Sequence, residues 1–253
     1  LVIAAPIIGA IKPAAEIAKT VNENMENTQV VDTTQTDVKP ATQAATPPPK
    51  PAAKPTLPPT PKPTPPPPMK VEPLPINLSG IGQQASQKFT LEKGLSIFKL
   101  THSGTGHFGV WLLDSEGNNI DLLANDTGSF NGSKALGIAT VGTYLLDISA
   151  TGPWTVTIEQ PRPVSAAAMP LSLVGAGQQA TQLGTLPKGL ATFTLTHNGS
   201  GHFSIWLMDS KGNNMDLLVN ETGAFNGSKA VKISQTGIYL FSVSADGNWT
   251  IQR

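Results

Sequence analysis

The chain has 253 residues, with 17 basic and 17 acidic side chains and a formal net charge of zero. This balance lacks the basic patch or stripe of a nucleic-acid-binding protein, and arginine occurs only at positions 162 and 253, so no nucleic-acid partner is expected. The absence of cysteine excludes disulfides, cysteine-based zinc sites and a thiol nucleophile.

Residues 1–25 begin with an apolar run and continue with a helical pattern. The run Leu1–Ile11 is too short to span a bilayer, for which a transmembrane helix needs about 20 apolar residues. From Ile11 to Met25, apolar residues recur at helical spacing, which predicts a short helix. Three interpretations stay open: the end of a transmembrane helix, a segment that packs in a filament or in a neighbouring subunit, and residual signal sequence or a buried segment. We expect an extracellular or cell-surface location, with self-association or anchoring to the membrane or cell envelope through residues 1–25.

Residues 26–75 are first polar and then rich in proline. Most of the 23 prolines lie between Pro40 and Pro75. Proline fixes φ and has no amide donor, so this segment is not expected to join a helix or a sheet. We predict an extended stalk in the polyproline II conformation, with about 3.1 Å per residue.

The rest of the chain is an internal repeat. Gly80–Ile158 aligns without a gap onto Gly175–Arg253, and roughly 47 of 79 positions are identical. A short joint with three prolines separates the copies. The prediction is two domains, called repeat 1 (residues 76–160) and repeat 2 (residues 170–253).

Each repeat shows about seven short strand patterns with turn residues between them and no helical periodicity. The predicted fold class is therefore all-β, with two tandem jelly-roll-like β-sandwiches. The strands predicted for repeat 1 are Phe89–Leu91, Leu95–Thr101, His107–Leu113, Asn119–Ala124, Lys134–Ala139, Thr143–Ile148 and Trp154–Ile158.

The order of motifs in each repeat resembles that of a bacterial module family. Gly-Leu-x-x-Phe-x-Leu-Thr-His is followed by Phe-x-x-Trp-Leu-x-Asp, Gly-Asn-Asn, Gly-x-Tyr-Leu and Gly-x-Trp-Thr. This order resembles the pre-peptidase C-terminal (PPC) β-sandwich modules and the repeated modules of microbial surface proteins. The resemblance implies a non-catalytic appendage for adhesion, stability or carbohydrate contact, and it implies no catalytic residues.

The four histidines belong to the repeat. His102 and His107 flank one predicted turn, and His197 and His202 flank its copy. A histidine pair can bind zinc or act as an acid or base, but no third ligand of suitable spacing accompanies it. We predict structural hydrogen bonds, no cofactor and no catalytic site, because each polar candidate is duplicated and no Gly-x-Ser-x-Gly motif is present.

One acidic turn in each repeat has oxygen ligands that could hold calcium. Asp and Asn also favour such turns without an ion, so calcium is the weaker of the two interpretations. The residues are Asp114, Asn118 and Asp121, with Asp209, Asn213 and Asp216 in repeat 2.

The four tryptophans are candidates for a platform on which a sugar ring stacks. Trp111 lies in an apolar strand pattern, and we expect it, with its copy Trp206, in the core. Trp154 and Trp249 follow a turn and are the better platform candidates, although core packing is the first interpretation for them as well.

Asn-x-Ser/Thr sequons mark candidate N-glycosylation sites, mostly at predicted turns. Two pairs of sequons arise from the repeat, and chance enrichment in a chain rich in Asn, Ser and Thr is the competing explanation. The acceptors are Asn77, Asn125, Asn131, Asn198, Asn220, Asn226 and Asn248.

Together these patterns predict a non-catalytic structural or adhesive protein of the cell surface. One version is a subunit of a pilus-like extracellular filament that displays its sandwiches outside. The rival hypothesis is a membrane-tethered pair of carbohydrate-binding modules, because two linked modules gain avidity on a polysaccharide. Exposed rings at Trp154 and Trp249 favour sugar binding, and buried rings favour a structural role.

Overall fold

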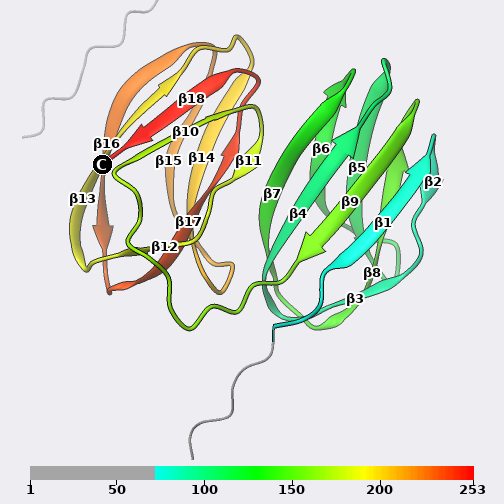
Figure 1. The fold of residues 1–253 in the computed structure, drawn as a ribbon, viewed down its shortest axis with the longest axis horizontal. Helices are drawn as coiled ribbons and strands as arrows, with labels where there is room; N and C mark the ends of the chain where they lie inside the picture. The colour runs from blue at the N-terminus through cyan, green and yellow to red at the C-terminus, as the bar shows by residue number, and fades with distance from the viewer. Residues whose placement is uncertain (1–71) are drawn as a thin grey trace, which may run out of the picture. The chain divides into compact units, whose positions relative to one another are not determined.

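The computed structural model of the chain describes residues 72–253, which form two copies of one β-sandwich (Figure 1). The predicted all-β fold class is confirmed. The predicted N-terminal helix and nearly all of the predicted stalk lie outside the described residues. Within residues 72–253, no helix is long and apolar enough to cross a membrane.

Repeat 1 consists of two antiparallel sheets that face each other across a core. In the first sheet the strand order is β1 (Ile76–Ile81), β9 (Pro153–Glu159), β4 (Gly94–His102) and β7 (Phe130–Ile138). In the second sheet the order is β2 (Gln84–Ala85), β8 (Gly142–Ser149), β5 (His107–Asp114) and β6 (Asn119–Thr127), and β3 (Phe89–Leu91) also pairs with β8.

Repeat 2 has the same topology. Its first sheet has the order β10 (Ser172–Ala176), β18 (Asn248–Gln252), β13 (Gly189–His197) and β16 (Phe225–Ile233). Its second sheet has the order β11 (Gln179–Ala180), β17 (Gly237–Ser244), β14 (His202–Asp209) and β15 (Asn214–Thr222), and β12 (Gly184–Leu186) also pairs with β17.

Two strands of each repeat were not predicted from the sequence. In repeat 1 they are β1 and β2, and in repeat 2 they are β10 and β11. Strand β1 follows directly on the proline-rich segment and contains a single fully buried side chain, Leu78. Strand β2 has only two residues, both exposed. Strand β1 does alternate from Ile76 to Ser79, but the pattern covers only four residues before Gly80, and β2 is too short to show a pattern.

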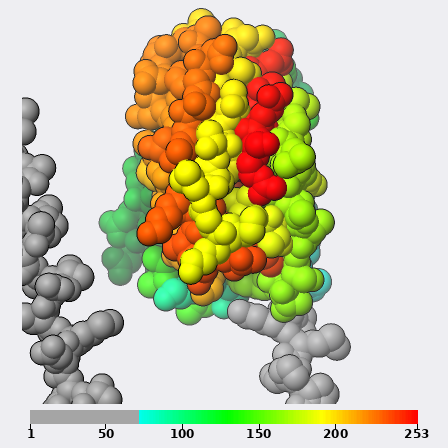
Figure 2. All heavy atoms as spheres, turned by 90° about the vertical axis from the view of Figure 1, so that its left-hand side faces the viewer, coloured from blue at the N-terminus to red at the C-terminus, as the bar shows by residue number. Residues whose placement is uncertain are grey.

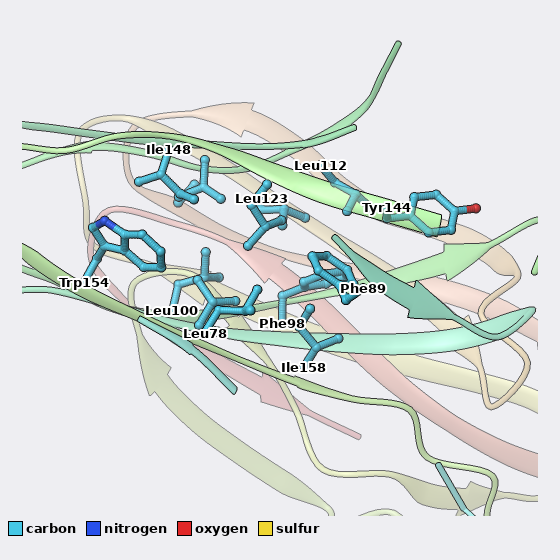
Figure 3. Close-up of a cluster of buried hydrophobic side chains, with 14 of the residues drawn as sticks. Leu78, Phe89, Phe98, Leu100, Leu112, Leu123, Tyr144, Ile148, Trp154 and Ile158 are labelled. Carbon is cyan, nitrogen blue, oxygen red and sulfur yellow. The ribbon is translucent and has the colours of Figure 1, made fainter. Parts of the chain in front are cut away.

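Each sandwich has a separate apolar core, and Figure 3 shows that of repeat 1. Trp154 and Tyr144 lie at opposite ends of this row of side chains. The Trp154 indole Nε1 donates a hydrogen bond to Gly82 O at 3.1 Å. The ring also lies against Gly80, where an added Cβ would be 2.5 Å from the ring, so this position has room only for glycine. Strand β1 thus holds the tryptophan in place.

The two repeats contact each other through different faces. An apolar cluster joins Leu95 of β4 and Ala135 of β7 to Met208 of β14 and Leu240 of β17. All four side chains are buried. Arg162, in the segment between the repeats, donates hydrogen bonds to Leu95 O at 2.7 Å and to Lys93 O at 3.0 Å. We call this contact the internal joint.

Trp249→Ala should lower the free energy of unfolding of repeat 2 by about 3–5 kcal/mol, because it empties the end of a packed core and removes the hydrogen bond from Nε1 to Gly177 O. Urea denaturation followed by circular dichroism measures this change. The control is Trp206→Ala, at a ring that is 37% exposed, which should cost less than about half as much. Equal losses would contradict the assigned core.

Candidate functional site

The tryptophans divide into two buried rings and two surface rings. Core packing, the first interpretation for Trp154 and Trp249, is confirmed, whereas the expected core position of Trp111 and Trp206 is wrong. Trp154 and Trp249 are each 2% exposed, so no sugar ring can stack on them. Trp111 and Trp206 are 38% and 37% exposed and lie on the outer face of their sheets. Successive side chains of a strand point to opposite faces of the sheet. Phe108 points into the core, so Trp111, three residues later in β5, points to the outer face.

A groove of about 620 Å³ lies beside Trp206 at the internal joint. The outer faces of β14 and β17 supply Trp206, His202 and Ser242 to its wall. Asp121 and Lys134 of repeat 1 line it from the other repeat and form an ion pair at 2.7 Å. The groove therefore combines one aromatic surface with hydroxyl, imidazole and charged groups, a combination suited to a polar ligand with an apolar face.

Repeat 1 has the matching tryptophan without a second wall. Trp111 is paired in register with Asp147 of β8, where Trp206 has Ser242. Among the described residues, no second repeat lies over this face. The two tryptophans are thus equivalent in sequence but differ in surroundings, and sequence reasoning did not find the groove because it depends on how the repeats pack.

A second hollow of about 760 Å³ lies where the connecting segment meets the joint. Lys93, Arg162 and Lys211 line it. The Arg162 guanidinium is already bonded to backbone carbonyl groups, including Leu95 O and Lys93 O. Its contacts therefore hold the connecting segment on β4.

The structure places the two histidines of each predicted pair apart. His102 is buried, stacks on Phe108 with a centroid distance of 4.7 Å and lies 2.7 Å from Gly128 O through Nδ1. His107 is exposed on the outer face of β5. His197 repeats the arrangement, stacking on Phe203 at 4.4 Å, while His202 lines the groove. The inner histidines make the kind of turn contact that was predicted, and the pairs do not converge on one site.

Asp246 is a site feature that sequence reasoning missed. Its carboxylate accepts hydrogen bonds from Gly201 N at 2.7 Å and Ser200 N at 3.0 Å. These backbone hydrogen bonds, with that from Gly201 as the largest cause, hold the pKa of the Asp246 carboxyl below its ordinary value of 3.8. Oδ1 also lies 3.1 Å from His197 Nε2, without the alignment of a hydrogen bond. Repeat 1 has Thr151 at this position, and its hydroxyl accepts from Gly106 N at 3.0 Å.

The calcium candidates are occupied by contacts within the chain. Asp114 Oδ1 accepts hydrogen bonds from the amides of Glu116 and Asn118, and Oδ2 accepts from the Asn118 side chain at 2.8 Å. The hydrogen bonds from Asn118 lower the pKa of Asp114. Asp121 pairs with Lys134. In residues 72–253, no group of three or more His, Asp or Glu side chains is placed to hold a metal ion. In repeat 2, Asp209 and Asn213 form the same turn, and Asp216 lies 3.9 Å from Lys229.

All seven sequon asparagines are exposed, as glycan acceptors must be. Their predicted position at turns is wrong for most of them. Only Asn198 lies outside a strand, while Asn77, Asn125, Asn131, Asn220, Asn226 and Asn248 lie within strands.

Comparisons with known proteins leave the family open. No family model matches the chain, and no curated protein sequence matches it. Among solved structures, the chain is similar to an F-lectin (fucolectin) from Morone saxatilis (striped bass) serum, with 9% identity, coverage of 70% of this chain and 83% of that chain, and a TM-score of 0.22. It is also similar to a cupin 2 conserved barrel domain protein from Leptotrichia buccalis, with 11% identity, coverage of 72% and 90%, and a TM-score of 0.17. Likeness at these scores supports no inference about function.

Asp246→Thr should make the stability of repeat 2 less sensitive to acid. A carboxyl whose folded-state pKa lies below its unfolded value of 3.8 stabilises the fold above that value, and the contribution is lost as the pH falls through the lowered pKa. The variant copies Thr151 of repeat 1 and lacks this contribution. Urea denaturation between pH 6 and pH 2 should show the difference between wild type and variant shrinking with acid. A difference that stays constant with pH would refute the assignment.

Proposed function

We propose that the chain is a non-catalytic structural or adhesive protein of the cell surface, in which the two sandwiches are the displayed part and residues 1–25 anchor or assemble the chain. The observation that carries the proposal is the role of the side chains that are identical in the two copies of the repeat. Each sandwich uses these side chains for its own structure: Trp154 and Trp249 pack in the cores, and the buried histidines His102 and His197 contact the turns. The duplicated histidines and tryptophans therefore stabilise two copies of one fold, which supports a structural role.

The internal joint supports the same role. Repeats linked only by a flexible segment would move independently, whereas these repeats share buried apolar side chains and are tied through Arg162. A tandem pair held in this way transmits load and keeps a defined spacing, which suits a surface layer or a fibre. The version favoured here is a subunit of an extracellular filament with its sandwiches displayed outside.

Electron microscopy of material sheared from native cells tests this role. We expect regular filaments or arrays whose repeating unit is this chain, identified by labelling with an antibody against residues 72–253. Dispersed particles or single membrane-bound stalks would contradict the filament version.

The Trp206 groove favours a second candidate function, carbohydrate binding. A half-exposed indole beside hydroxyl and imidazole groups is a common way to bind a sugar, with the ring on its apolar face and hydrogen bonds at its edge. The groove exists only at the internal joint within the described residues, so this candidate predicts one such site for each chain. The predicted platform at Trp154 and Trp249 is excluded by their burial.

Trp206→Ala should weaken binding to a matching polysaccharide by about tenfold or more, because the stacking surface is lost. Pull-down with insoluble cellulose, chitin and xylan, followed by a glycan array, measures the effect. Trp111→Ala is the matched control, since this ring is equally exposed but has no second wall, and it should leave binding unchanged. Absence of binding by the wild type, or equal loss in both variants, would count against a groove ligand.

A further inference from the structure

The internal joint is a contact between two different faces. Repeat 1 contributes the outer face of β4 and β7, and repeat 2 contributes the outer face of β11, β14 and β17 (Figure 1). Such a contact is heterologous, because it joins two different surfaces, and its repetition between chains produces either a ring or an open fibre. Because the repeats have the same fold, each has one face that corresponds to the face its neighbour contributes to the joint. In repeat 1 this free face is formed by β2, β5 and β8, and in repeat 2 it is formed by β13 and β16.

Specific hydrogen bonds accompany the apolar cluster of the joint. Ser133 N donates to Gln178 O at 3.0 Å, and Ala180 N donates to the Ser133 hydroxyl at 2.9 Å. The Gln178 side chain donates to Leu123 O at 2.8 Å. Gly132 allows this approach, because an added Cβ there would lie 2.8 Å from Gln178 O. Edge strand β7 is thereby covered by edge strand β11, which removes an open sheet edge.

The free faces bear the same or similar groups at many of the positions that form the joint. Leu190 is 77% exposed, whereas its equivalent in the joint, Leu95, is fully buried. Figure 2 looks onto this side of repeat 2, where β13 is yellow and β16 is orange. On the β13–β16 face, the positions of Leu95, Ala135, Ser133 and Gly132 are taken by Leu190, Ala230, Ser228 and Gly227, in that order. On the β2–β5–β8 face of repeat 1, the positions of Met208, Leu240, Gln178 and Ala180 are taken by Leu113, Leu145, Gln83 and Ala85.

We propose that the β13–β16 face of one chain binds the β2–β5–β8 face of a second copy, so that chains associate head to tail. The partner follows from the internal joint, which already shows these groups bound to each other within the chain. The inference rests on the proposed structural role, because a structural subunit assembles with other copies of its own chain. The contact itself is a property of residues 72–253.

A sequence difference between the two repeats should make the contact between chains weaker than the internal joint. An added Cβ at Gly137 would lie 2.1 Å from Gly212 O, so the joint depends on glycine there. Repeat 2 has Lys232 at this position, and its side chain keeps the second chain further away along that edge. In the equivalent arrangement Lys232 faces Gly117 and the adjacent Glu116, a residue of opposite charge. The association is therefore reversible and depends on concentration. Further differences include Thr192 in place of Ile97, Lys88 in place of Leu183 and Asp147 in place of Ser242.

Sedimentation velocity of the purified full chain over a range of concentrations tests the proposal. The wild type should form dimers and longer species as concentration rises, whereas Leu190→Glu and Leu113→Glu should each shift association by tenfold or more towards the monomer. Ile81→Glu is the matched control, because Ile81 is an equally exposed apolar residue (76%) outside both faces, and it should behave as wild type. Thermal unfolding establishes that each variant is folded.

Mixing the two variants identifies the arrangement. Leu190→Glu keeps an intact β2–β5–β8 face and Leu113→Glu keeps an intact β13–β16 face, so an equimolar mixture should form dimers that grow no further. Lys232→Gly should strengthen association of the full chain by tenfold or more, and this variant tests the contact even if a glutamate variant does not fold.

Two results would overturn the inference: a wild type that stays monomeric and is unaffected by Lys232→Gly, or an association that neither glutamate variant weakens. In either case filaments from native cells would still support the structural role, with assembly then assigned to another surface. Conversely, head-to-tail dimers in solution without native filaments would uphold this contact and remove the proposed filament.

Discussion

The packing of Leu95 and Ala135 against Met208 and Leu240 determines how the two sandwiches are used. Each sandwich has its own core, but only this contact and its hydrogen bonds cover strand β7 and create the groove beside Trp206. Burying these side chains stabilises the joint by roughly 25 cal/mol for each Å² of apolar surface removed from water. The glycines at 132, 137 and 212 allow the two backbones to come close enough for the contact to form.

The same sequence pattern therefore occurs in two environments. Leu95 is buried in the joint and Leu190 is exposed to solvent, although both occupy the same position of the repeat. Lys232 and Lys88 show that the free faces are more polar than their counterparts in the joint, which limits uncontrolled association of exposed sheet edges. The chain thus combines a permanent contact within the molecule with weaker complementary faces at its two ends.

Much of the fold could be predicted from the sequence because the repeat, the turn residues and the short strand patterns all favour the same all-β architecture. The position of Trp111 could not, because Val110 to Leu113 is continuously apolar and conceals the alternation that turns Trp111 outward. Burial of Trp154 depends on Gly80 in β1, a strand whose alternating pattern extends over only four residues, from Ile76 to Ser79. The groove and Asp246 depend on contacts between residues far apart in the chain, which no local pattern encodes.

Amide hydrogen exchange, followed by NMR in dilute protein, tests most directly whether the internal joint exists in solution. Ser133 and Ala180 donate their amides across the joint, while their equivalents Ser228 and Ala85 lie on the free faces. The account predicts that Ser133 and Ala180 exchange at least about tenfold more slowly than Ser228 and Ala85 after correction for intrinsic rates. Equal exchange rates within each pair would show that the repeats do not hold this contact and would contradict the account.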